Sequence, residues 1–229
     1  MALELQNLSL TQGNFSLSAD VSLPSGGLCA VIGPSGAGKS TLFDAIAGFL
    51  EPNTGKISWQ GTDLHPLPPG KRPIAMLFQD NNLFPHMNVE RNIGLALTHR
   101  RLSAAQVVDV ETVLDKVGLS GFGQRKLSEL SGGQRSRVAL ARVLLQDRPL
   151  WLLDEPFAAL GPALKKEMLG LVKSMATETG ATVLMITHDP ADAKAFADRV
   201  VLVADNQVTG PFDTGALFAD PPEALRDYL

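Results

Sequence analysis

A glycine-rich loop between a strand and a helix constrains the fold of this 229-residue chain more than any other feature. Residues 33–40 have the sequence GPSGAGKS, which matches the pattern GxxxxGK[ST], and they follow the apolar run LCAVI. In such a loop the glycines let the backbone approach phosphate oxygens, and the amides at the helix start point toward the anion. The sequence therefore predicts a phosphate-binding loop after a buried strand.

The side chains of this loop indicate a nucleotide with a bound metal ion. Lys39 adds positive charge for the β- and γ-phosphates, and the Ser40 hydroxyl is suited to ligate Mg²⁺. An ordinary glycine-rich turn is the alternative, which the strand-loop-helix context disfavours. The expected phosphate-binding residues are Gly33, Pro34, Ser35, Gly36, Ala37, Gly38, Lys39 and Ser40.

The order of strands and helices predicts the fold class. Three further apolar segments, PLWLLDE, TVLMITH and RVVLVAD, alternate with helical segments after SGGQ, from Pro162 and at ADAKAFAD. Pro162 suits the first position of a helix. This alternation predicts an α/β fold, a P-loop NTPase core whose mostly parallel sheet is covered on both faces.

The N-terminal segments alternate apolar and polar residues, which is typical of antiparallel strands. LELQNLSL and FSLSADVSL are expected to pair around a turn at residues 12–14, EPNTGK to form a turn, and KISWQG and IAMLF to be strands. Asp205 and Asn206 predict a tight turn. We expect an N-terminal antiparallel β-subdomain.

A change to helical spacing between Val89 and Lys126 predicts an inserted α-helical subdomain. Its clearest apolar stripe consists of Val107, Val110, Val113, Leu114 and Val117. We expect one domain over 1–229, with a core of 1–86 and 147–229 and a helical subdomain of about 87–146.

Polar residues follow three of the expected strands. Asp154 is suited to hold Mg²⁺ and Glu155 to deprotonate an attacking water, because strand ends in a parallel sheet face the ligand crevice. Two carboxylates alone would more often form a solvated turn, but the phosphate loop favours the catalytic interpretation. Gln79 and His188 end two other strands, where each alone would be an ordinary surface residue.

A second glycine pair lies far from the first loop. In ELSGGQRSRVALAR, residues 129–142, Gly132 and Gly133 follow a serine and precede a predicted helix, which is again the chemistry of an anion cradle.

With these motifs in this order, the whole chain resembles the ATP-binding subunits of ABC transporters. The phosphate loop, Gln79, LSGGQ at 130–134, WLLDE at 151–155 and His188 carry the resemblance. It implies ATP and Mg²⁺ as ligands and a head-to-tail homodimer, in which LSGGQ contacts nucleotide held by the partner. The contacting residues would be Ser131, Gly132, Gly133 and Gln134.

The resemblance also implies roles for single residues. Thr41 reaches the α-phosphate, while Ser40, Asp154 and Gln79 serve Mg²⁺. Gln79 also senses the attacking water and links to the membrane subunit. Glu155 is the general base and His188 contacts the γ-phosphate.

Within the family, MLFQDNNLFPHMNVERNIGLAL (residues 76–97) is most similar to the ATPase of bacterial thiamine importers. This resemblance implies membrane permease subunits and a periplasmic or extracellular substrate-binding protein. Phe84, Pro85 and Met87 would line a groove for a permease helix; alternatively, they pack the helical subdomain. Importers of iron, sulfate or polyamines remain alternatives, although they usually carry about a hundred more residues in a further C-terminal domain.

Composition limits the partners and the location. The formal net charge is −4 and the chain has no basic footprint, so no nucleic-acid partner is expected. The single cysteine fits a reducing compartment, and neither a secretory signal nor an apolar run of about 20 residues is evident. We expect a peripheral protein at the cytoplasmic face of the inner membrane.

Two departures from the family pattern bear on activity. Ala158 and Gly161 replace the usual Ser and Asp after the catalytic glutamate, which predicts weaker coupling of the two sites or slower hydrolysis. Family members usually have an aromatic residue ahead of the phosphate loop that stacks on the adenine, and by spacing Gln12 is near that position. Phe15 is the nearest aromatic residue, and the only tyrosine, Tyr228, lies at the other end of the chain. A feeble nucleotide switch, which Gly161 motivates, is one competing hypothesis. A soluble ABC-type ATPase of repair or translation is another, although such proteins usually carry two cassettes or long coiled coils in one chain.

Overall fold

The computed structural model describes residues 2–158 and 160–226. Five short apolar segments form its parallel strands: β3 (Leu28–Ile32), β6 (Ile74–Leu77), β7 (Leu150–Asp154), β8 (Thr182–Ile186) and β9 (Arg199–Ala204). They pair in the order β9-β3-β8-β7-β6, and every pair is parallel. Strands β3, β7 and β8 are buried at every position, as a sheet covered on both faces requires. The predicted mostly parallel core is confirmed.

Antiparallel strands extend this sheet: β1 (Leu3–Gln12), β2 (Phe15–Leu23), β4 (Thr54–Trp59), β5 (Thr62–Asp63) and β10 (Gln207–Asp213). Gln12 lies in β1 rather than in the turn, because it pairs with Phe15 and leaves a two-residue loop. The turn expected at EPNTGK is shorter than predicted, because Thr54 already belongs to β4 and pairs with Ser9 of β1.

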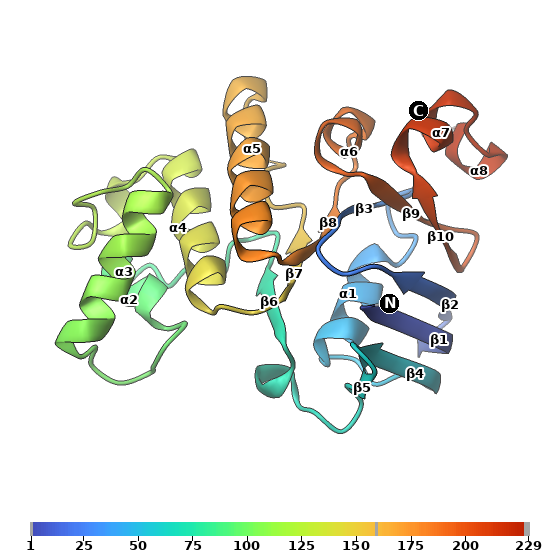
Figure 1. The fold of residues 1–229 in the computed structure, drawn as a ribbon, viewed down its shortest axis with the longest axis horizontal. Coiled ribbons are helices and arrows are strands. Elements are labelled where there is room, and N and C mark those ends of the chain that lie inside the picture. The colour runs from blue at the N-terminus through green and yellow to red at the C-terminus, as the bar shows by residue number, and fades with distance from the viewer. Residues whose placement is uncertain (1, 159, 227–229) are drawn as a thin grey trace.

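One ten-stranded sheet contains both sets of strands, in the order β5-β4-β1-β2-β10-β9-β3-β8-β7-β6 (Figure 1). The connection between the sets is β10, which pairs antiparallel with β9 and, through Gln207 and Val208, makes a short parallel pairing with β2. Asp205 and Asn206, both in the left-handed region, form the predicted tight turn before β10.

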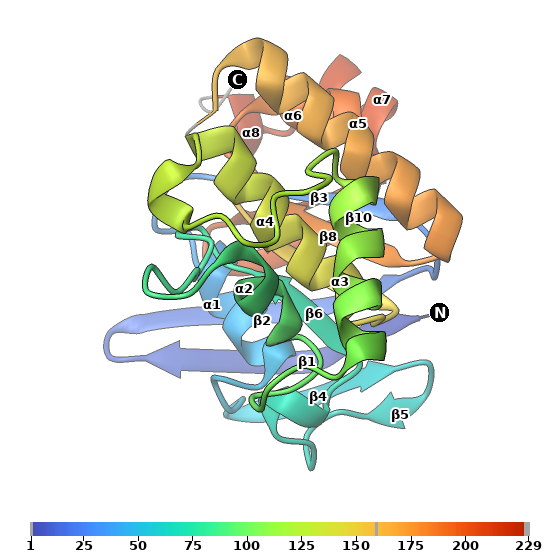
Figure 2. The same ribbon diagram turned by 90° about the vertical axis from the view of Figure 1, so that its left-hand side faces the viewer.

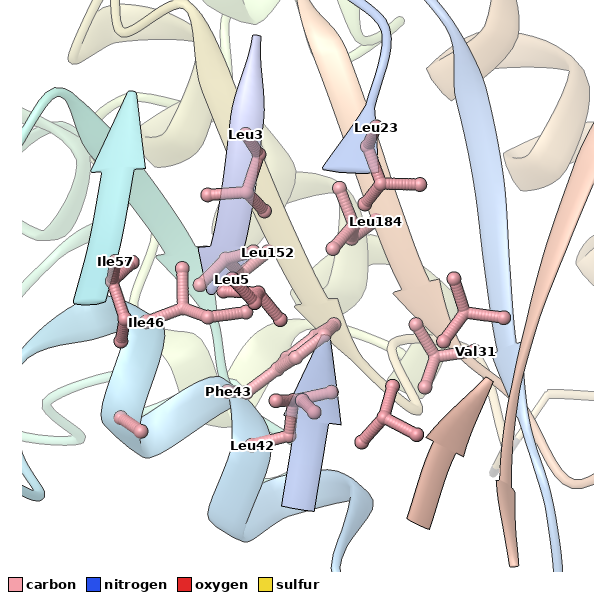
Figure 3. Close-up of a cluster of buried hydrophobic side chains, with 14 of the residues drawn as sticks. Leu3, Leu5, Leu23, Val31, Leu42, Phe43, Ile46, Ile57, Leu152 and Leu184 are labelled. Carbon is pink, nitrogen blue, oxygen red and sulfur yellow. The ribbon is translucent and has the colours of Figure 1, made fainter. Parts of the chain in front are cut away.

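Helices cover the two faces of the sheet separately. Helix α1 (Lys39–Ala47) packs on the face that carries Leu150 and Leu152 of β7, together with the antiparallel strands (Figure 3). The other face carries Trp151 and Leu153 of β7. On it pack α4 (Gly132–Leu145), α5 (Pro162–Thr179) and α6 (Pro190–Phe196). The helix that follows each glycine loop therefore lies on a different face.

A third hydrophobic cluster lies under the helical segment. It joins α2 (Val89–Gly94), α3 (Ala104–Lys116), the 3₁₀ turn η2 (Leu127–Glu129) and one side of α4 (Figure 2). Of the predicted stripe, Val107 is partly exposed and the other four members are buried. The helices are separated by irregular segments at residues 95–103 and 117–126.

The remaining elements are a 3₁₀ turn η1 (Pro69–Lys71) and two C-terminal helices, α7 (Thr214–Ala219) and α8 (Glu223–Arg226). In the part of the chain that the structure describes, no helix is long and apolar enough to cross a membrane.

Candidate functional site

The first glycine loop connects β3 to α1 and holds its lysine inward. Lys39 is 7% exposed, and its Nζ donates hydrogen bonds of 2.8 Å to the carbonyl oxygens of Gly33 and Pro34. Burial lowers the pKa of Lys39, and the nearby charges of Glu155 and Asp154 oppose that shift. A desolvated ammonium at a helix start is suited to bind an anion.

Backbone geometry explains two of the loop glycines. Gly33 has φ +150°, and a Cβ there would lie 1.9 Å from the carbonyl oxygen of Val203. Gly38 has φ +100°, and a Cβ there would lie 2.4 Å from Cζ of Phe15. Only glycine combines this conformation with so close an approach.

Phe15 therefore packs directly against the phosphate loop. Its ring is partly buried and also contacts the apolar cluster around α1. Gln12 pairs with Phe15 across the hairpin and is exposed. Tyr228 lies outside the described residues. The structure thus brings Phe15 to the predicted nucleotide site and fixes its ring with packing.

A buried carboxylate lies beside the loop at the end of β7. Asp154 is 8% exposed, and burial raises its pKa, while a hydrogen bond from the Ser40 hydroxyl lowers it. These two oxygens fit a hard divalent cation such as Mg²⁺. Over residues 2–158 and 160–226, no cluster of three or more His, Cys, Asp or Glu side chains could hold a metal. The pair would thus supply part of a coordination shell that phosphate and water oxygens complete.

Glu155 has a left-handed backbone, with φ +43°. Its amide donates to the carbonyl oxygen of Ile186 over 3.2 Å, and its Oε2 lies 3.1 Å from Nδ1 of His188. A non-glycine residue in this region stores strain and is common at active sites. The contact brings together two residues that the sequence placed on separate strand ends.

The loop around His188 is anchored to α5 by an ion-pair network. Nζ of Lys165 lies 3.0 Å from carboxylate oxygens of both Asp189 and Asp192. Thr187 donates to Asp192 over 3.3 Å, and the Asp189 amide donates to the Thr187 hydroxyl over 3.1 Å. The sequence reasoning missed Lys165, whose partners follow β8 and are distant in sequence.

The second glycine loop caps α4. The Ser131 hydroxyl accepts from the Gln134 amide over 3.3 Å, and the Gln134 side chain accepts from the Ser131 amide over 2.9 Å. Ser131 and Gly132 are exposed, whereas Gly133 is buried. A Cβ at Gly133 would lie 2.2 Å from Cδ2 of Leu164, so this glycine permits close packing of α4 against α5. The capping box occupies the amides of Ser131 and Gln134, and the exposed helix start at Ser131 and Gly132 is suited to bind an external anion.

The predicted site residues thus form two groups. The phosphate loop, Asp154, Glu155 and His188 lie together at the carboxyl ends of β3, β7 and β8. LSGGQ belongs to α4, whose sheet contacts lie on the opposite face from those of α1.

Gln79 follows β6, is exposed, and lines a cavity of about 540 Å³ that also contains Gly132 and Pro85. A neighbouring groove of about 410 Å³ is lined by Phe84 and by Phe49, which the sequence reasoning missed. Phe49 and Phe84 are 58% and 44% exposed. Met87, which we expected to line a groove together with Phe84 and Pro85, is half-buried.

Two buried polar side chains hold this groove in place. Asn92 in α2 is fully buried and accepts from the Phe84 amide over 2.8 Å, while its own amide donates to the Phe84 carbonyl. Arg72 donates to the carbonyl oxygens of Ala45 and Ile46 at 2.8 and 2.6 Å, and so caps the C-terminus of α1. The groove is therefore tied to the phosphate-loop helix.

The fold and these motifs define the ATP-binding subunits of ABC transporters, which are ATPases coupled to transport, and this chain belongs to that family. The family model described as "ABC transporter" matches residues 17–158. Similar proteins named "Thiamine import ATP-binding protein ThiQ" include those of Cereibacter sphaeroides, Ruegeria sp. and Jannaschia sp.. They are 58%, 54% and 46% identical to the chain over 228 residues, which is at least 99% of each protein.

Solved structures give the same fold. A dimeric bacterial ABC transporter cassette is 27% identical, with a TM-score of 0.80 over 93% of this chain and 98% of that one. The cbiO1 protein of Clostridium perfringens, part of the ABC transporter complex cbiONQ, is 27% identical with a TM-score of 0.85 over 99% of this chain and 93% of that one.

Proposed function

We propose that this chain is the ATP-hydrolysing subunit of an importer for thiamine. The observation that carries the proposal is full-length similarity to proteins named for thiamine import, at up to 58% identity. The chain would work at the cytoplasmic face of the inner membrane with permease subunits and a periplasmic or extracellular substrate-binding protein.

In this proposal two chains form a head-to-tail homodimer with two composite sites. The loop at 33–40 of one chain binds the phosphates of ATP, with Thr41 near the α-phosphate, and Ser131 to Gln134 of the other chain contact the same nucleotide. The placement of α1 and α4 on opposite faces of the sheet supports this arrangement. ATP would then close the dimer, and loss of its γ-phosphate would open it.

Hydrolysis requires a base beside the γ-phosphate. Glu155 would accept a proton from the attacking water, and its contact with His188 would orient the carboxylate. Mg²⁺, which Ser40, Asp154 and Gln79 would help to hold, supplies charge neutralisation for the phosphates. Lys39 would add a further positive charge at the loop.

The groove with Phe49 and Phe84 is the proposed contact for a permease helix. Two exposed aromatic rings beside an apolar hollow are typical of an interaction site. The separate apolar cluster of the helical segment supports the proposed organisation, a single domain over 1–229 with a core of 1–86 and 147–229 and a helical subdomain of about 87–146.

A slowly hydrolysing switch is the second candidate, and Gly161 favours it. Gly161 is the N-cap of α5 and has no side chain to offer the facing chain or its own helix. The retained Glu155 and His188 favour turnover.

Uptake of labelled thiamine by cells carrying Lys39→Ala tests the proposed function. We expect uptake to be lost, while uptake of an unrelated nutrient is normal. A Lys173→Ala chain, altered at an exposed lysine of α5, is the matched control. Normal thiamine uptake in cells that have no other thiamine route would contradict the proposed cargo and redirect the search to iron, sulfate or polyamines.

A further inference from the structure

A partly buried arginine in α4, Arg142, holds the loop that follows Gln79. Arg142 donates from Nη2 to the carbonyl oxygen of Asn81 over 2.7 Å and from Nη1 to that of Asn82 over 2.8 Å. Partial burial lowers the pKa of the guanidinium. A planar guanidinium donates to these two neighbouring carbonyls from two separate nitrogens in a fixed geometry, whereas a lysine has a single nitrogen to offer.

The loop that Arg142 holds is conformationally strained. Asn81 and Asn82 have φ of +58° and +44°, a left-handed pair that asparagine tolerates better than most residues. In addition, Oδ1 of Asn81 is the one buried side-chain nitrogen or oxygen without a hydrogen-bond partner in the described ranges. An unpaired buried acceptor and two left-handed residues disfavour this conformation, and the two bonds from Arg142 stabilise it.

The same helix begins at the second glycine loop. Ser131 caps α4, and Arg142 lies about 16 Å farther along the axis at a rise of about 1.5 Å per residue. Between them, Ala139 and Leu140 pack on the sheet, and Val138 and Ala141 pack in the helical cluster. Packing on both sides favours movement of α4 as a rigid body.

The loop at residues 79–82, which Arg142 holds, borders both the cavity and the groove beside α4. Gln79 and Asn81 line the cavity of about 540 Å³, whereas Asn82 and Arg142 line the groove of about 410 Å³ with Phe84. A shift of α4 would therefore move this loop through Arg142 and alter both Gln79 and the groove.

We propose that Arg142 is a positioning residue that transmits the engagement of Ser131 with the partner's nucleotide to the Gln79 loop and to the groove of the same chain. This inference rests on the proposed function, because it requires ATP to close a dimer. Arg142 forms part of the groove wall and acts on the Gln79 loop through the backbone of Asn81 and Asn82.

Hydrogen exchange in the full-length chain tests the link. A Glu155→Gln background keeps ATP bound, and the amides of Asn81 and Phe84 report on the loop, since both are hydrogen-bonded. We expect ATP-driven dimerisation to change their exchange rates about tenfold, and less than about twofold once Arg142→Met is added. Sedimentation should show that the Arg142→Met chain still dimerises with ATP.

Two further variants separate positioning from general softening. Arg137→Met, on the same helix, removes bonds to Val117 and Glu167 and should keep the loop response. Arg142→Lys retains the charge and a fold close to the original, and should give an intermediate response. It replaces Arg142→Met in the comparison if that chain does not fold.

The outcomes distinguish the two proposals. If the dimer forms and the loop responds equally with and without the Arg142 guanidinium, the positioning role is wrong. The same conclusion follows if Arg137→Met abolishes the response as fully as Arg142→Met. If the Glu155→Gln chain binds ATP but never dimerises, the composite-site proposal itself fails, and this inference fails with it.

Discussion

Nδ1 of His188 lies 3.1 Å from Oε2 of Glu155, so the residues after β8 and β7 form one polar pair at the edge of the parallel sheet. Glu155 reaches this position from a left-handed backbone conformation, and a hydrogen bond from its amide to the carbonyl oxygen of Ile186 holds it there. The carboxylate is 20% exposed and thus remains accessible to a water molecule. This geometry fits a general base with a fixed orientation.

Replacing Glu155, the proposed base, should stop hydrolysis without preventing binding. Glu155→Gln retains the shape of the side chain but cannot take a proton, so kcat for ATP should fall about 100-fold or more. The Kd for ATP should change by less than about threefold, because the phosphate loop is intact. Steady-state turnover and equilibrium binding measure the two effects.

The exposed Glu178 provides the matched control, since Glu178→Gln makes the same chemical change at a surface ion pair with Lys116. Its kcat should equal that of the original chain. Full turnover in Glu155→Gln would remove Glu155 as the base.

Restoring a carboxylate at Gly161 should stabilise α5. Gly161 has φ −66° and ψ 158°, an ordinary N-cap conformation, and apart from its chain neighbours no atom of the described residues lies within 4 Å of an added Cβ. Gly161→Asp should raise the free energy of unfolding by about 0.5 kcal/mol through capping and the helix dipole. It should also increase ATP-driven dimerisation or the rate of hydrolysis.

Gly161→Asn separates the two effects, because it caps the helix without adding charge. Urea unfolding, turnover and sedimentation of the three chains give the comparison. The weak-coupling hypothesis fails if Gly161→Asp changes neither dimerisation nor turnover.

A side chain at Gly38 should clash with Phe15. Gly38→Ala places a methyl group 2.4 Å from Cζ of Phe15 and forces alanine to φ +100°, so we expect a loss of about 2–3 kcal/mol in the free energy of unfolding. Phe15→Ala in the same chain should relieve the clash but not the backbone strain. A double-mutant cycle by urea unfolding should therefore show a favourable coupling of about 1 kcal/mol. Additive effects would mean that the ring is not confined against the loop.

The pair of Lys165 and Asp189 predicts how stability depends on pH. The hydrogen bond from Lys165 holds the pKa of Asp189 below its usual value of 3.8. A lowered folded-state pKa stabilises the protein above the unfolded-state pKa, and this stabilisation is lost as the pH falls through the folded-state value. The free energy of unfolding of Lys165→Met should thus differ from the original by a constant amount between about pH 5 and 8.

Below pH 3.8 that difference should shrink, which acid titration of the unfolding free energy measures for both chains. Lys166→Met, at the neighbouring position on α5, is the control and should show no such change. A difference that grows as the pH falls would contradict the assigned pair.

Local sequence patterns predicted much of this structure. The strands predicted from the apolar runs at β3, β7 and β8 are confirmed, because strands buried on both faces must be continuously apolar. Pro162 begins α5 as predicted, since proline lacks only an amide that is unpaired there. At Thr54 the prediction was wrong, because pairing with β1 overrides a local turn signal.

The missed features depend on contacts between distant segments. The positive φ of Glu155, the buried Asn92 and the reach of Arg142 to Asn81 all follow from tertiary packing, which periodicity does not report. Phe49 follows α1 and meets Phe78 at a ring distance of 5.9 Å, so its part in the groove required the fold. The loop glycines were recognisable because phosphate binding imposes a local pattern.

Mixing two inactive chains tests the composite site most directly. Lys39→Ala lacks a working phosphate loop, and Ser131→Arg lacks a working second loop, so each homodimer should be inactive. In a mixed dimer, the intact phosphate loop of one chain faces the intact LSGGQ of the other and forms one complete site. We expect ATP hydrolysis in the mixture to rise well above the sum of the two chains measured alone. A mixture no more active than that sum, with mixed dimers demonstrated, would contradict a nucleotide site shared between two chains.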